Sequence, residues 1–153
     1  MDRGVPMLLP QTAEYALRAM AHLATLAPGS STRAAEISEA TGIPAQYVWK
    51  IMRRLVLADL VSSQKGHGGG FALRRDPKSI SFREILQAVG FATEVNRCAF
   101  GWGRCSSSRP CPLHGTWSQL KDAFEQWSQR TTLAQIPRGF VPIVRVQRSR
   151  RRL

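Results

Sequence analysis

Apolar residues recur at helical spacing through the first part of the chain. Those that repeat every three or four residues are Ala16, Leu17, Met20, Leu23 and Ala24. This period predicts an amphipathic helix over residues 12–26. The Pro-Gly-Ser-Ser run at 28–31 ends that helix. Either Ser31 or Thr32 is then placed to cap a short second helix over residues 32–40.

A third helix, predicted over residues 45–58, divides into an apolar and a polar side. Its apolar positions lie at i, i+3, i+7 and i+10: Val48, Ile51, Leu55 and Ala58. Its polar side holds Gln46, Lys50 and Arg53, with Tyr47 and Arg54 adjoining. A helix, a short glycine-containing turn and a second helix make the helix-turn-helix pattern, whose second helix enters the major groove of DNA. The alternative is a solvated face on an ordinary helical hairpin.

Two short strands, predicted over residues 60–64 and 70–73, follow this helix directly. Their connection is rich in glycine and contains Lys65 and His67. A glycine-rich hairpin after a recognition-type helix is typical of a wing, the second DNA contact of winged-helix proteins. A nucleotide phosphate loop is the other reading of three consecutive glycines, but no GxxxxGK[ST] motif is present.

Two further helices are predicted in the second half of the chain. Ser81-Phe82-Arg83-Glu84 is a capping-box sequence and opens a helix that ends near Val89. Pro112 suits the first turn of a last helix, which runs to about Thr131. Its large apolar residues recur at spacings of 4, 3, 4 and 3: Leu113, Trp117, Leu120, Phe124 and Trp127. Such a stripe needs a partner, and we expect a second copy of this chain; cover within the monomer is the alternative.

The charge of the chain favours a polyanionic partner. Its 22 basic and 10 acidic residues give a formal net charge of +12, which points to nucleic acid or to an anionic membrane.

No secretory signal and no run of 18 apolar residues is present, so we expect a cytoplasmic protein without a membrane span. We expect a DNA-binding domain over 1–90, a loop over 91–111, a dimerisation helix over 112–136, and a disordered basic tail over 137–153.

The three cysteines of the chain lie together as Cys98-x6-Cys105-x5-Cys111. Such clustering indicates metal binding first and redox chemistry second. The gaps are wider than the tight pairs of structural zinc sites, which favours an iron–sulfur cluster over zinc, with redox-active thiols third. With Pro112 at the first helical position, Cys111 is expected at a helix N-cap, where free N–H groups stabilise a thiolate. His114 lies one helical turn further on and is the candidate fourth ligand.

These residues together resemble the Rrf-two family of winged-helix transcription regulators, the iron–sulfur regulators of the IscR and NsrR type. The resemblance runs from about residue 8 to residue 136. Its carriers are residues 14–20, 35–37, the wing over 60–71, residues 85–89, the three cysteines with Cys-Pro-Leu-His at 111–114, Trp117, and Thr132-Leu133. The fold that it implies is mainly α with a small β-wing, namely a winged helix-turn-helix plus a long dimerisation helix.

The resemblance implies a homodimer that binds palindromic double-stranded operator DNA. One cluster per subunit, 2Fe-2S or 4Fe-4S, would control DNA affinity in response to iron or cluster supply, nitric oxide or oxidants, most simply in a repressor. By position Cys98, Cys105 and Cys111 match the cluster cysteines. The fourth ligand is a histidine at the place of His114 in some members and a first-helix carboxylate at the place of Glu14 in others.

The resemblance also bears on DNA contacts and on rival functions. Lys65 stands where relatives place a wing arginine in the minor groove, and Gln46, Tyr47 and Lys50 stand at the base-reading start of the recognition helix. No catalytic constellation appears, so we expect no enzyme. An iron–sulfur electron carrier is the rival from another class, and it leaves the helix-turn-helix and the wing unexplained. A zinc- or thiol-based regulator of the same fold is the nearer rival.

Overall fold

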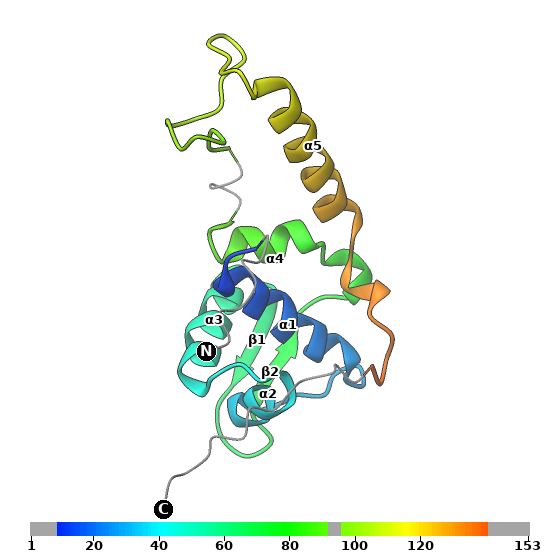
Figure 1. Ribbon diagram of the computed structural model, residues 1–153. Coiled ribbons are helices and arrows are strands. Elements are labelled where there is room, and N and C mark those ends of the chain that lie inside the picture. The colour runs from blue at the N-terminus through cyan, green and yellow to red at the C-terminus, as the bar shows by residue number, and fades with distance from the viewer. Residues whose placement is uncertain (1–8, 92–95, 141–153) are drawn as a thin grey trace, which may run out of the picture.

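The computed structural model describes residues 9–91 and 96–140 of the 153-residue chain. Its helices are α1 (Gln11–Thr25), α2 (Ala34–Thr41), α3 (Ala45–Leu57), α4 (Phe82–Ala88) and α5 (His114–Arg130). The strands are β1 (Val61–Gln64) and β2 (Gly70–Leu73), and the short 3-10 helices are η1 (Pro77–Ser79) and η3 (Leu133–Gln135). The predicted fold class, mainly α with a small β-wing, is confirmed (Figure 1). From residue 141 onward, the predicted basic tail lies outside the described residues.

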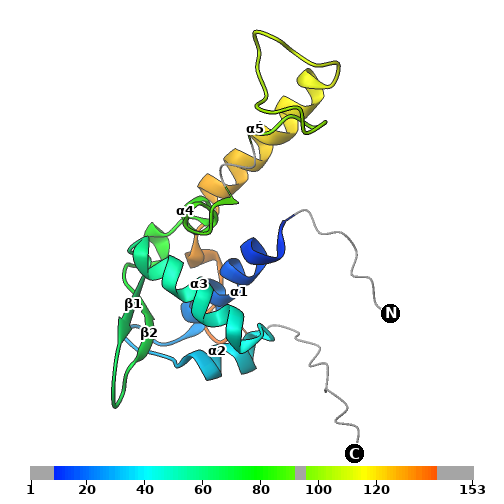
Figure 2. The same ribbon diagram turned by 90° about the vertical axis from the view of Figure 1, so that its left-hand side faces the viewer.

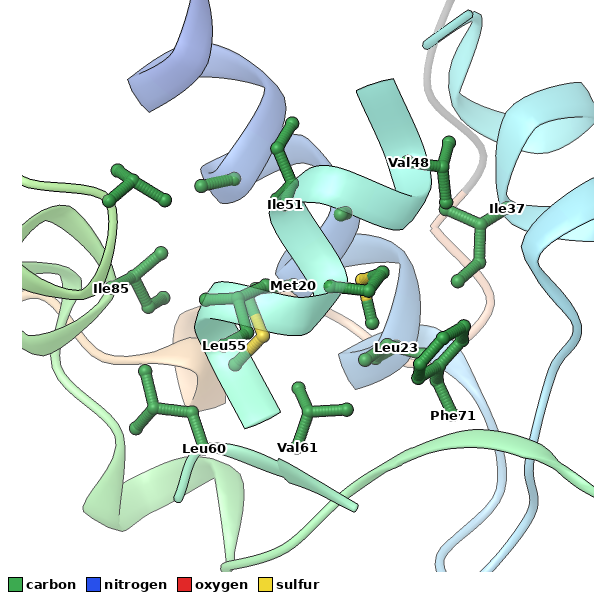
Figure 3. Close-up of a cluster of buried hydrophobic side chains, with 14 of the residues drawn as sticks. Met20, Leu23, Ile37, Val48, Ile51, Leu55, Leu60, Val61, Phe71 and Ile85 are labelled. Atoms are coloured by element: carbon green, nitrogen blue, oxygen red, sulfur yellow. The ribbon is translucent and has the colours of Figure 1, made fainter. Parts of the chain in front are cut away.

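The core of the body forms around α1, which contacts α2, α3, α4, β2 and η3. The buried face of α1 is made of small residues and two larger ones: Ala13, Ala16, Ala19, Met20, Leu23 and Ala24. Figure 3 shows Met20 and Leu23 facing Leu55 of α3 and Phe71 of β2. Because alanine occupies little volume, neighbouring backbones can approach α1 closely and the interior remains densely packed.

The turn between α2 and α3 is the one that the sequence predicts. Gly42 ends α2 with φ of 71°, a left-handed conformation that glycine adopts without strain. The predicted cap of α2 was wrong: the helix begins at Ala34, and its N-cap is Arg33. The reason is tertiary, since the backbone of Thr32 is paired with Phe71 of the wing and the helix can start only after that pair.

The wing is a two-stranded hairpin tied to the body at Phe71. Val61 pairs with Leu73 and Gln64 with Gly70. The Phe71 N–H donates to the Thr32 carbonyl at 2.7 Å, and the Thr32 N–H donates to the Phe71 carbonyl at 2.9 Å. These two bonds pair residue 32 with the hairpin and fix where the hairpin leaves the body. At the glycine-rich tip, the Ser31 hydroxyl donates to the Gly68 carbonyl at 3.0 Å.

The helix α5 leads away from the body, and the cysteine-containing loop lies at its far end in both views (Figure 2). The end of α5 near the body packs on α4, where Phe82 meets Trp127 edge-on at 5.6 Å and Arg83 pairs with Glu125 at 3.0 Å.

The predicted capping box of α4 is confirmed, because the Glu84 N–H donates a hydrogen bond to the Ser81 hydroxyl. Among the described helices, none combines the length and apolar composition needed to cross a membrane.

We predict that Gly70→Ala destabilises the fold by about 1–3 kcal/mol. A Cβ atom at Gly70 would lie 2.5 Å from the Thr32 carbonyl oxygen, at a φ of +144° that other residues rarely adopt. Urea denaturation of the metal-free protein measures this loss. Gly115→Ala is the matched control, because its Cβ meets nothing within 4 Å; its stability should be unchanged or higher by up to about 1 kcal/mol. Equal stability of Gly70→Ala and the wild type would contradict the account of the wing.

Candidate functional site

The three cysteines lie in a loop that folds back on itself before α5. Arg97 and Arg104 form an antiparallel bridge. The Cys98 N–H donates to the Gly103 carbonyl at 2.8 Å, and the Cys105 N–H donates to the Asn96 carbonyl at 2.9 Å. Because side chains alternate across extended segments, this pairing sets Cys98 and Cys105 on one face of the loop and the two arginines on the other.

The structure brings the four predicted ligands together in two pairs. The sulfur of Cys98 lies 3.9 Å from the sulfur of Cys111. The sulfur of Cys105 lies 3.3 Å from Nδ1 of His114. The other ring nitrogen of His114 lies 3.4 Å from the hydroxyl of Ser118, one turn along α5, which holds the orientation of the ring. All three thiols are free and partly buried.

Both separations fit two donors that share one metal ion. Two thiolates bound tetrahedrally at about 2.3 Å lie about 3.8 Å apart, and a thiolate and an imidazole nitrogen lie about 3.5 Å apart. Within residues 9–91 and 96–140, however, no group of three or more Cys, His, Asp or Glu side chains surrounds a point suited to one ion. The structure thus brings the four side chains together as two pairs and not around one point.

The prediction that Cys111 caps the last helix was wrong. The helix α5 begins at His114 with Leu113 as its N-cap, because the His114 N–H donates to the Cys111 carbonyl and closes a tight turn over residues 111–114. The stabilised thiol is instead Cys98. A hydrogen bond from the backbone N–H of Phe100 lowers the pKa of Cys98, with smaller contributions from Cys111 and from nearby Lys121.

The alternative ligand Glu14 lies elsewhere in the same chain. It lines a groove of about 550 Å³ between α1 and α5, together with Leu120, Phe124 and Trp127. Leu120 is about 9 Å further along α5 than His114, so one chain does not bring Glu14 to the cysteines. Among the described residues, Oε1 of Glu14 is a buried oxygen without a hydrogen-bond partner.

The predicted DNA-contacting residues are displayed mainly on α3 and on the wing. Gln46, Tyr47, Lys50 and Arg53 are exposed on α3, and Lys65 and His67 are exposed at the tip of the wing. Arg54 differs from the others, because it is partly buried and its Nη1 donates to the Val89 carbonyl at 3.1 Å. The structure thus gives Arg54 an internal partner that links α3 to the end of α4.

Sequence reasoning missed Trp49. This side chain is 62% exposed on α3, and its ring meets Phe71 of the wing edge-on at a centroid distance of 5.6 Å. Trp49 comes directly after Val48 of the apolar stripe, and it belongs neither to that stripe nor to the polar residues of the helix. The sequence signal that could have found it is a large aromatic residue next to a buried stripe, because such a side chain faces solvent.

The predicted dimerisation residues fall into two groups. Leu113, Leu120 and Trp127 are 44%, 51% and 42% exposed and lie seven residues apart, which places them on one line along α5. Trp117 and Phe124 are partly covered within the chain. Phe124 packs on Phe91. Nε1 of Trp117 donates to the Arg97 carbonyl at 2.9 Å and so ties the cysteine loop to α5.

Comparison with known proteins is consistent with this architecture. The model of the Rrf2 family, described as an iron-dependent transcriptional regulator, matches residues 9–138. The HTH-type transcriptional regulator IscR of Escherichia coli O1:K1 / APEC is 33% identical over 130 residues, which cover 85% of this chain and 80% of that protein.

Two solved structures share the fold. CymR, the global cysteine regulator of B. subtilis, superposes with a TM-score of 0.70 at 20% identity and covers 84% of this chain and 94% of its own. IscR of T. potens superposes with a TM-score of 0.67 at 22% identity, and the match covers 84% of this chain and 85% of the T. potens chain. The relatives named here are transcriptional regulators and not enzymes.

We predict that Cys98 is alkylated several-fold faster than Cys105 and Cys111 in the reduced, metal-free protein near neutral pH. Its lowered pKa increases its thiolate fraction below the ordinary pKa of a thiol, and the thiolate is the reactive form. Competitive labelling with iodoacetamide followed by peptide mass spectrometry measures the three rates. In urea the three rates should become equal. Equal rates in the native protein would show that the Phe100 N–H does not stabilise the thiolate.

Proposed function

This chain belongs to the Rrf2 family of transcriptional regulators, and we propose that it binds operator DNA as a homodimer whose affinity is set by an iron–sulfur cluster in each subunit. The observation that carries the proposal is the pairing of four metal donors at the start of α5, 3.9 Å and 3.3 Å apart. We place this regulator in the cytoplasm, where thiols stay reduced and remain available as ligands.

The two donor pairs support a two-iron cluster. In this proposal Cys98, Cys111, Cys105 and His114 would hold the cluster, the first two as one pair of ligands and the last two as the other. A bound cluster supplies a centre that oxidants, nitric oxide or iron shortage can alter. Zinc fits less well, because a structural zinc ion draws all four ligands around one point. His114 is favoured over Glu14 as the fourth ligand, since His114 contacts Cys105 and Glu14 faces the middle of α5.

The exposed face of α3 and the wing support the DNA-binding part of the proposal. Lysine and arginine side chains bind phosphates, and glutamine and lysine suit adenine and guanine edges in the major groove. Gln46, Lys50 and Arg53 lie at i, i+4 and i+7, and all three are exposed. Lys65 extends the basic surface to the wing tip and would contact DNA beside the groove that α3 enters.

A second copy of the chain is the proposed partner of α5. The line of Leu113, Leu120 and Trp127 is large and apolar, and each of its side chains stays more than 40% exposed within one chain. Two such lines packed across a twofold axis would bury each other, as in a coiled-coil seam. This arrangement would also set the spacing between the two recognition helices and thus favour a palindromic operator.

The contact between Cys98 and Cys111 favours a second candidate function, that of a thiol-based redox regulator. Their sulfurs need to close from 3.9 Å to about 2.05 Å to form a disulfide. Oxidation by a peroxide would release two protons and pass two electrons to the oxidant, and Cys105 would remain beside His114. This candidate needs no metal and uses the same loop.

Metal analysis of protein purified without oxygen tests the proposal. We expect about two iron and two acid-labile sulfide per chain with a brown colour, and loss of both in Cys105→Ser and in His114→Ala. Glu14→Gln is the matched control and should keep the full metal content. Zinc without iron would contradict the cluster and support a zinc-based regulator. A colourless protein that forms a Cys98–Cys111 disulfide after peroxide treatment would contradict the cluster and support a thiol-based regulator.

We predict that Lys50→Ala lowers affinity for the preferred operator by about 1–3 kcal/mol and relaxes its sequence preference. Arg53→Ala should instead weaken binding to all sequences and reduce the salt slope by about 1. Fluorescence anisotropy with operator and scrambled duplexes at several salt concentrations measures both effects. A uniform loss on all sequences for Lys50→Ala would contradict its base-reading role.

A further inference from the structure

The side chain of Trp49 occupies a place on α3 from which it can reach DNA. Counted along the helix, Gln46, Trp49 and Arg53 stand at i, i+3 and i+7 and so form one row on one face. All three are exposed. Trp49 is on the edge of this row that faces the wing, as its contact with Phe71 shows. An apolar ring therefore stands between two polar side chains on the face proposed to enter the major groove.

The ring of Trp49 is held in position from behind. Phe71 is 5% exposed, and its backbone is fixed by the two hydrogen bonds to Thr32. The indole meets this anchor at an interplanar angle of 70°, the edge-to-face geometry that aromatic pairs prefer. Such a contact restricts the side chain to one direction while 62% of its surface stays open. Binding would then cost little rotamer freedom.

Neither the core nor the dimer surface accounts for this exposed tryptophan. A tryptophan that served only the core would be mostly covered, as Phe71 is. Among the other exposed aromatic residues, Phe100 and Trp102 belong to the cysteine loop, Trp127 to α5 and Phe140 to the end of the described residues, whereas Tyr47 lies on α3 with Trp49. That loop lies at the end of α5 distant from α3 (Figures 1 and 2). Trp49 thus belongs to the surface of the recognition helix and not to the proposed dimer surface.

We propose that Trp49 determines sequence specificity by placing its indole against the C5-methyl group of a thymine in the major groove, on the side of α3 that faces the wing. The thymine methyl is the apolar group that base pairs display in this groove, so it is the chemical match for an exposed indole flanked by polar side chains. This inference rests on the proposed DNA-binding function and deepens it by naming a base and the residue that reads it.

The test begins with selection of preferred sites from random duplexes by the wild-type holoprotein. Each thymine of the selected site is then replaced by uracil, which lacks only the C5-methyl group. For the wild type we expect one or two thymines per half-site at which uracil weakens binding about 4-fold, the effect of one buried methyl group. Trp49→Ala should bind thymine and uracil equally at those positions, and Trp49→Phe should keep part of the difference.

Trp102→Ala is the matched control, because it removes a tryptophan that is 73% exposed and lies far from α3; its uracil profile should equal that of the wild type. A wild-type profile that is flat at every thymine overturns the role of Trp49, and this result does not depend on whether any variant folds. A wild type that selects no sequence at all overturns the proposed operator binding as well, so the two failures are distinguishable.

Discussion

The alanine residues of α1 set the distance at which the rest of the body packs. Ala13, Ala16 and Ala19 are each 1% exposed or less, and α2, α3, α4 and β2 all contact this helix. A larger side chain at any of these positions would push a neighbouring backbone outward, because a close-packed interior has no spare volume. Gly42 sets the turn between α2 and α3, and the two hydrogen bonds between Thr32 and Phe71 fix the place where the wing leaves the body. The proposed DNA-binding surface of α3 is the side opposite the buried residues with which this helix packs on the body.

The cysteine loop is built in the opposite way, with few contacts of its own. It is tied to α5 by the Trp117 side chain and folded by the bonds around Cys98 and Cys105. Of the described loop residues, Phe91 packs against the hydrophobic core and those from 96 to 111 do not belong to it. A metal cluster that bridges Cys98, Cys105, Cys111 and His114 would thus supply a large share of the loop's order, since metal binding and local folding are coupled. A segment whose order depends on its cofactor is suited to report the state of that cofactor.

Helix and strand types could be predicted from the sequence because they depend on local patterns, such as the stripe of α3 and the capping box at Ser81. The start of α2 could not be predicted in this way, because the backbone of Thr32 pairs with Phe71, a strand residue 39 positions later. The presence of the metal donors was equally local, but their pairing depends on how the loop folds back. Arg54 and Trp49 show the same limit, because the partners that define them, Val89 and Phe71, are distant in the sequence.

A physical route connects the proposed cluster to the recognition helix. The loop continues into α5, and α5 packs on α4 through Phe82 and Trp127. The end of α4 in turn accepts the hydrogen bond from Arg54 of α3. Adjacency alone does not make a switch, because a ligand shifts an equilibrium only as far as its affinity differs between two states. In a dimer joined along α5, those states would be two spacings of the recognition helices, and a palindromic operator binds only the spacing that matches its half-sites. The cluster would need to favour one packing of α5 by about 5.5 kcal/mol to change the population of the DNA-binding state from about 99% to about 1%.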